Sequence, residues 1–145
     1  MGDAKPPLVA ELVWSRPRAE SRGAGLSFDA TSGANTAVVD GDGTDGPSPM
    51  QYAAMGLAGC MGADVVDIIR KGRHPLAALR VTFTGTRAAD PPRRFLQIRL
   101  QFHVEGAVPS EAVERAIALS REKYCSVWHS FRQDIELITT FDISP

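Results

Sequence analysis

Alternation of apolar and polar residues is most regular in the second half of the chain. From Leu96 to Glu105 every second residue is apolar, and the residues between them are Gln, Arg, His and Glu. A shorter run with the same period covers Leu79 to Thr84, and Asp90-Pro91-Pro92 lies between the two runs. A period of two is typical of strands that bury one face. We therefore expect two neighbouring strands joined by a turn.

The pattern changes between Tyr52 and Ala63, where no residue is charged. A helix that is apolar all round is a buried helix. The preceding segment, Ser48-Pro49-Met50-Gln51, has the features of a helix start, because Ser can cap, Pro suits the first helical position and Gln completes a capping box. Arg70-Lys71-Gly72 marks the end of this helix, with cations in its last turn and glycine after it.

The remaining segments complete an α+β order. Three short strands, separated by Gly and Ser, are expected at Leu8 to Trp14, Gly25 to Phe28 and Thr36 to Val39. After the strand pair, a second helix begins near Pro109-Ser110 and has an apolar face. A short helical segment follows from Cys125 to Phe131, and a strand from Ile135 to Phe141 closes the chain. The order βββ-α-ββ-α-β predicts an α+β fold, and residues 1–145 fit a single domain.

The apolar face of the second helix is formed by Val113, Ala116, Ile117, Ser120 and Tyr124.

Charge and hydropathy narrow the class of protein. The chain has 16 Lys and Arg against 17 Asp and Glu, and this balance argues against a nucleic-acid partner, which requires a basic excess. No uninterrupted apolar run reaches the ~18 residues of a membrane span. Residues 1–7 lack the apolar core of a signal peptide. We expect a cytoplasmic protein that binds no membrane, with cysteines that are reduced by default.

Cys60 and Cys125 are the only cysteines and the strongest candidates for chemistry. Cys60 lies in the apolar helix among small residues that leave space around its sulfur. Cys125 follows Lys123 and precedes a short helix, a setting that stabilises a thiolate. For each cysteine alone, the alternative is a small buried side chain without a chemical role.

Other residues offer supporting roles. Asp64 lies one turn after Cys60 and either begins the solvated half of the helix or holds a nearby cation. Arg22 is a candidate for that cation, and Arg16 and Arg18 compete with it. His129 shares a helical face with Cys125, so an acyl-transfer pair is a further alternative to a solvated histidine.

Metal and cofactor sites are not expected. Two cysteines and three scattered histidines lack the spacing of a zinc site. His74 and His103 are expected to be ordinary surface residues. The loop Asp40 to Gly46 partly matches a calcium loop, but Asp45 replaces its glycine and Gln51 its bidentate glutamate. That loop is interpreted as a turn.

Two segments resemble the cysteine motifs of the OsmC/Ohr superfamily. Ser48 to Cys60, followed by Asp64-Val65-Val66, resembles the first motif, and Ser120 to Val127 resembles the second. The strand from Arg93 to Gly106 also fits, and the resemblance covers residues 8 to 143.

The resemblance implies an OsmC-like fold, with antiparallel sheets wrapped around two central helices in an intertwined homodimer. It also implies that Cys60 attacks an organic hydroperoxide, that Cys125 resolves the product, and that a thiol or lipoyl-type reductant restores both. No cofactor is required. The implied role is defence against oxidative stress.

One position departs from the peroxidase pattern. In the peroxidase branches, a Glu that follows the Pro of the first motif pairs with an Arg, and Met50 stands there in this chain. The branch that this chain most resembles carries Glu one residue later, where this chain has Gln51. Glutamine cannot form an ion pair with arginine. Arg22, Gln51 and Asp64 remain the candidates for thiolate support. The alternative function is a non-catalytic dimer that binds or senses a hydrophobic ligand.

Overall fold

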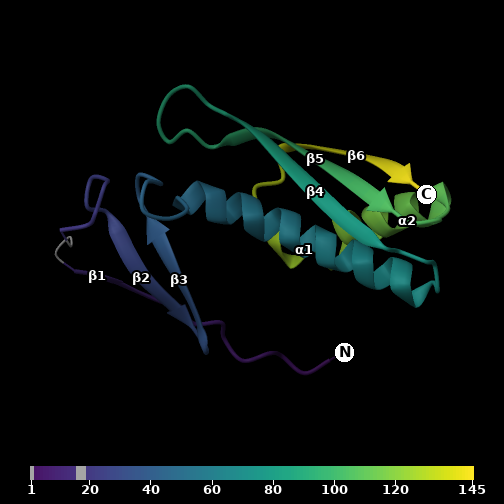
Figure 1. Ribbon diagram of the computed structural model, residues 1–145, viewed down its shortest axis with the longest axis horizontal. Coiled ribbons are helices and arrows are strands. Elements are labelled where there is room, and N and C mark those ends of the chain that lie inside the picture. The colour runs from purple at the N-terminus through teal and green to yellow at the C-terminus, as the bar shows by residue number, and fades with distance from the viewer. Residues whose placement is uncertain (1, 16–18) are drawn as a thin grey trace. The chain divides into compact units, whose positions relative to one another are not determined.

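The computed structural model of the protein describes residues 2–15 and 19–145, so Arg16 and Arg18 lie outside the described residues. The chain divides into two compact units, one ending at Ala53 and the other running from Ala54 to Pro145. The elements follow the expected order βββ-α-ββ-α-β, which confirms the α+β class (Figure 1). That the whole chain acts as one domain stays a prediction.

The first unit holds a three-stranded antiparallel sheet of β1 (Glu11–Trp14), β2 (Ser27–Ser32) and β3 (Asn35–Asp40). The second strand begins later and runs further than the pattern indicated. Glycine suits the tight turn between β2 and β3, because Gly33 has a positive φ of 59°, a conformation that strains most other residues.

The loop after β3 is held by its own carboxylates. The buried carboxylate of Asp40 accepts hydrogen bonds from the backbone N–H groups of Asp42, at 3.2 Å, and Asp45, at 2.7 Å. Asp42 accepts from the N–H of Ala24 at 2.7 Å, and this bond is the first cause of the lowered pKa of its carboxyl group. These carboxylates serve the backbone, which agrees with a turn.

Helix α1 (Pro49–Lys71) begins and ends where the sequence indicated. The Ser48 Oγ accepts a hydrogen bond from the N–H of Gln51 at 3.2 Å, and the Gln51 Oε1 accepts one from the N–H of Ser48 at 2.8 Å. These reciprocal bonds form the predicted capping box. By length and composition α1 could cross a membrane, but the core helix of a globular protein passes the same test.

Only one face of α1 is buried. The buried stripe repeats every four residues and consists of Leu57, Met61, Val65 and Ile69, each at most 1% exposed. Gly59 and Ala63 lie on another face and are exposed. The expectation of a helix buried all round is therefore wrong for the single chain, because the sheet and the second helix cover only one stripe of it.

The second unit holds a sheet of β4 (Ala78–Arg87), β5 (Phe95–Glu105) and β6 (Glu136–Ser144), with β5 in the centre. Strands β4 and β5 are antiparallel, but β5 and β6 are parallel. The expectation of purely antiparallel sheets is wrong for this pair. Its cause is the helical connection between them, since a crossover with a helix returns the chain in the same direction.

A register shift at Thr86 and Arg87 explains one departure in β5. Phe95 pairs with Arg87 and is buried, whereas Leu96 is skipped in the pairing and is exposed. An extra residue in one strand is a β-bulge, and it sends the extra side chain away from the core. The rest of the strand alternates as the pattern predicts, and its buried residues are Ile98, Leu100, Phe102 and Val104.

Three helical segments connect β5 to β6. They are α2 (Ser110–Leu119), the π-helix η1 (Ser120–Tyr124) and α3 (Ser126–Ser130). The sequence indicated an uninterrupted α-helical face up to Tyr124. Instead, the N–H of Cys125 donates to the carbonyl of Ser120 at 2.8 Å, five residues back, and Tyr124 is exposed. The wider turn directs Ser120 into the core and places Cys125 at the start of α3.

Candidate active site

Helix α1 and the π-helical connection bring the two cysteines together. The sulfur atoms of Cys60 and Cys125 and a carboxylate oxygen of Asp64 all lie within 4.8 Å of one another. Cys60 and Asp64 come from successive turns of α1, where residues four apart share a face. Cys125 is the N-cap residue of α3. All three residues belong to the second unit.

The carboxylate of Asp64 has a fixed partner. The Oγ of Ser120, which is fully buried, donates a hydrogen bond to it at 2.8 Å. The Oγ of Ser126 lies 3.9 Å from the sulfur of Cys60. Sequence reasoning missed both serines as site residues. The available signal was a polar Ser120 within the apolar face of the second helix, because a buried hydroxyl needs a hydrogen-bond partner.

The two thiols have different environments. The side chain of Cys60 is partly exposed, whereas Cys125 is buried. Burial raises the pKa of the Cys125 thiol to about 11, and the hydrogen bond from the N–H of Trp128, at 3.3 Å, opposes this only in part. The expected thiolate stabilisation at Cys125 is therefore wrong. Lys123 does not supply it, because its Nζ lies over the exposed ring of Tyr124, at 5.2 Å.

The histidines lie outside this cluster. The side chain of His129 is exposed, and its backbone N–H donates to the carbonyl of Cys125 at 3.1 Å. The imidazole of His129 is not part of the cluster formed by Cys60, Asp64 and Cys125, which gives no support for an acyl-transfer pair. The Nδ1 of His103 pairs with a carboxylate oxygen of Asp142 on the neighbouring strand, at 2.8 Å.

Arg22 and Gln51 belong to the first unit, each with local partners. The exposed guanidinium of Arg22 lies 3.5 Å from the carboxylate of Asp45. The pKa of that carboxyl group is lowered, first by the hydroxyl of Ser21 and then by the N–H of Arg22. Gln51 uses its side-chain oxygen in the capping box. Their roles beside a thiolate stay predictions.

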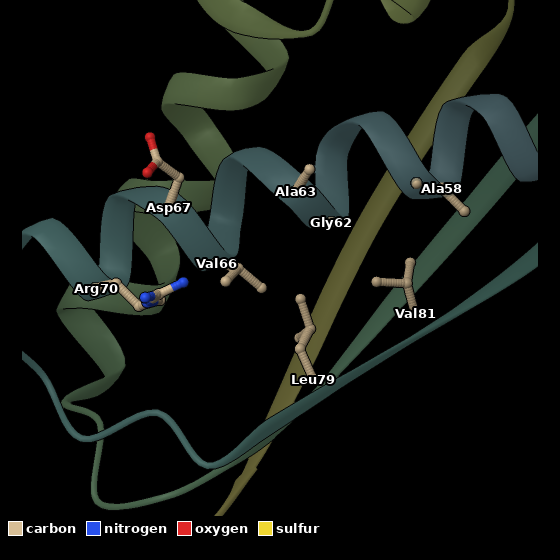
Figure 2. A pocket seen from close by; sticks show the side chains of 9 residues that line it. Ala58, Gly62, Ala63, Val66, Asp67, Arg70, Leu79 and Val81 are labelled. Atoms are coloured by element: carbon tan, nitrogen blue, oxygen red, sulfur yellow. The ribbon is translucent and has the colours of Figure 1, made fainter. Parts of the chain in front are cut away.

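An open groove runs along the small residues of α1. It has a volume of about 550 Å³ and is bounded by α1 and β4. Figure 2 shows Val66 of α1 and Leu79 and Val81 of β4 pointing into it. A side chain at Gly59 would meet nothing within 4 Å, whereas one at Gly62 would lie 3.3 Å from Val81. Most residues that line the groove are small or apolar, and the charged ones, Asp67 and Arg70, lie at one end of it.

Comparison with known proteins agrees with this architecture. Residues 41–140 match the family described as OsmC-like protein. Protein YhfA of Escherichia coli (strain K12) is 35% identical over 122 residues, which cover 82% of this chain and 91% of that protein.

Solved structures share the fold at lower identity. A hypothetical protein from Aquifex aeolicus VF5 superimposes with a TM-score of 0.83 at 22% identity, covering 97% of this chain and 98% of the other. An organic hydroperoxide resistance protein from Elizabethkingia anophelis gives a TM-score of 0.70 at 18% identity, covering 99% and 100%. At these identities the likeness shows the fold.

Proposed function

The chain belongs to the OsmC-like family, and we propose that it is a thiol-dependent peroxidase that reduces organic hydroperoxides through Cys60 and Cys125. The observation that carries the proposal is the cluster in which a partly exposed thiol, a buried thiol and a carboxylate lie within 4.8 Å of one another. The organic hydroperoxide resistance protein that shares the fold supports the choice of substrate class.

Cys60 takes the first step because its sulfur is the accessible one. Its thiolate attacks the distal oxygen of the hydroperoxide, the O–O bond breaks, and the alkoxide takes a proton and leaves as an alcohol. Cys60 becomes a sulfenic acid. Cys125 is a poor competitor for the peroxide, because burial raises the pKa of its thiol and keeps it protonated near neutral pH.

Cys125 then resolves the sulfenic acid. Its sulfur attacks the sulfur of Cys60, hydroxide leaves, and the thiol proton completes a water molecule. The sulfurs must approach to about 2.05 Å in the resulting disulfide. The carboxylate of Asp64, beside both sulfurs and held by Ser120, is placed to accept the Cys125 proton and pass it to the leaving oxygen.

A dithiol, of lipoyl or another type, restores the pair by two exchange steps and leaves as a disulfide. We place this cycle in the cytoplasm, where such reductants keep thiols reduced.

The functional protein is a homodimer in this proposal. The exposed small residues of α1 and the apolar groove beside them are the surface that a second chain would cover. Glycine and alanine allow another element to approach the helix backbone closely, which accounts for the number of small residues in this segment.

Turnover with cumene hydroperoxide and a dithiol tests the proposal. Cys60→Ser should abolish peroxide consumption. Cys125→Ser should leave a sulfenate on Cys60, which dimedone traps as a mass increase. Ser130→Ala is the matched control, because Ser130 lies one turn past the site and donates only to the carbonyl of Ser126. Wild-type protein that consumes no peroxide while its thiols persist would refute it.

A non-catalytic dimer is the second candidate, favoured by Gln51, which bears no charge to pair with arginine. In that case both cysteine variants would bind an apolar fluorescent probe with unchanged affinity, and the wild type would lack turnover.

A further inference from the structure

The same three side chains carry atoms that could hold a metal ion. The Cys60 and Cys125 sulfurs and an Asp64 oxygen lie within 4.8 Å of one another, from segments far apart in the chain. In a tetrahedral zinc site, with Zn–S distances of about 2.3 Å, two sulfurs are roughly 3.8 Å apart. A closure of at most about 1 Å would therefore bring both sulfurs to bonding distance of one ion.

We propose that the reduced protein binds one zinc ion per chain through Cys60, Asp64 and Cys125, with a fourth position left to water. Two thiolates and one carboxylate suit zinc, whereas calcium and magnesium require oxygen ligands. Three protein ligands with an open position differ from a closed structural site of four. The partly exposed Cys60 lies on the side from which an ion can enter.

The neighbours of the cluster orient its oxygen ligand. The buried Ser120 hydroxyl donates to Asp64 at 2.8 Å, so the carboxylate is directed before any ion binds. Hydrogen bonds of this kind are typical around metal ligands, and their loss weakens binding by about 10- to 100-fold.

The net charge of the cluster stays the same when zinc replaces the two thiol protons, which favours binding in a partly buried place. Two neutral thiols and one carboxylate carry a charge of −1. Zinc replaces the two thiol protons, so two thiolates, one carboxylate and Zn²⁺ carry the same charge. The ion therefore compensates the negative charge that deprotonation creates next to the buried sulfur.

Zinc binding and disulfide formation exclude one another. A disulfide sulfur offers no thiolate, so only the reduced pair binds the ion, and the bound ion occupies the sulfurs that the peroxide requires. This inference does not depend on the proposed peroxidase activity, because it concerns the reduced thiols alone.

Cobalt titration under anaerobic conditions tests the site. Reduced protein, freed of reductant and of any affinity tag, should bind one Co²⁺ per chain and develop thiolate-to-cobalt absorption bands in the near ultraviolet. One equivalent of Zn²⁺ should remove these bands. Protein oxidised to the disulfide should show none.

Variants assign the ligands. Cys60→Ser and Cys125→Ser should each remove at least half of the thiolate absorption and weaken binding by more than about 100-fold. Ser120→Ala should weaken it by about 10- to 100-fold. Glu114→Gln, an exposed carboxylate of α2, should leave binding unchanged.

Absence of thiolate bands in the reduced wild type would overturn the site, as would an affinity that the double variant Cys60→Ser/Cys125→Ser retains. Circular dichroism of each variant shows that it is folded. Peroxide consumption is measured separately, so loss of one property does not decide the other.

Discussion

At the scale of the residue, the two cysteines differ chiefly in their access to water. Cys60 is partly exposed on α1, and Cys125 is buried at the start of α3 with a pKa raised to about 11. Asp64 thus lies within 4.8 Å of two thiols that differ in their exposure to water. An accessible thiol suits attack on a substrate, and a buried thiol suits a reaction that takes place only inside the protein.

The raised pKa of Cys125 predicts a loss of stability at high pH. The unfolded chain releases this proton near the ordinary pKa of 9.0, whereas the folded protein holds it until about 11. The contribution is complete below about pH 9 and is lost as the pH rises through about 11. The free energy of unfolding of the reduced protein should fall by on the order of 2 to 3 kcal/mol more in the wild type than in Cys125→Ser.

Urea unfolding at several pH values, in a reductant without thiols, measures this difference. Wild type and Cys125→Ser share all other titrating groups, so the difference between their curves reports the Cys125 thiol together with its coupling to Cys60. Curves that stay parallel between pH 8 and 11 would show that the thiol is not held protonated.

The role of Asp64 gives a second prediction at this scale. Asp64→Asn keeps the size and a hydrogen-bonding oxygen for Ser120 but accepts no proton. We expect attack on the peroxide by Cys60 to persist and disulfide formation to slow by about 10²- to 10⁴-fold. Rapid-quench trapping of the sulfenate with dimedone measures both steps, and Asp67→Asn on the same helix is the control. Disulfide formation at the wild-type rate would remove Asp64 from the proton transfer.

At the scale of the element, the capping box of α1 connects sequence and structure most directly. Ser48 and Gln51 satisfy each other's backbone N–H groups, as their spacing predicts. Glutamate can make the same bond as Gln51. Exchanging Gln51 for glutamate therefore adds a negative charge beside the helix start and leaves the capping box intact.

Substitutions of Ser48 and Gln51 test whether the charge at residue 51 can change without loss of the capping box. Ser48→Ala should lower the free energy of unfolding by about 1 kcal/mol, because a backbone N–H loses its acceptor. Gln51→Glu should change it by less than about 0.5 kcal/mol. Thermal and urea unfolding measure both variants, and turnover of Gln51→Glu shows whether a carboxylate limits the reaction. A large destabilisation by Gln51→Glu would contradict the shared cap.

The sequence patterns predicted most helices and strands correctly, but they did not predict how distant segments pack together. The alternation in β5 and the cap of α1 depend on neighbours in sequence, and both are confirmed. The parallel pairing of β6, the bulge at Leu96 and the π-helix before Cys125 depend on how distant segments pack. For the same reason, sequence could nominate Cys60, Asp64 and Cys125 but could not bring them together.

At the scale of the whole molecule, the open face of α1 is the feature that a single chain leaves unexplained. Gly59 and Ala63 are exposed beside an apolar groove of about 550 Å³. A helix with an apolar, small-residue face is unusual on a free surface, and burial in a second chain would remove it from water.

A charge on this face should therefore separate the subunits. We expect the wild type to sediment as a dimer, and Ala63→Arg to raise the dissociation constant at least about 100-fold, because it places an unpaired cation in an apolar contact. Glu114→Arg, on α2, should not change the sedimentation. A wild-type monomer at micromolar concentration would contradict the dimer.

The proposed peroxidase cycle is tested most directly in a single turnover. Reduced protein is mixed with one equivalent of cumene hydroperoxide or, separately, of hydrogen peroxide, and free thiols are followed over seconds before disulfides are mapped by mass spectrometry. We expect the loss of two thiols per chain, a Cys60–Cys125 disulfide, and a faster reaction with the organic peroxide. Thiols that persist for minutes with either peroxide would contradict it.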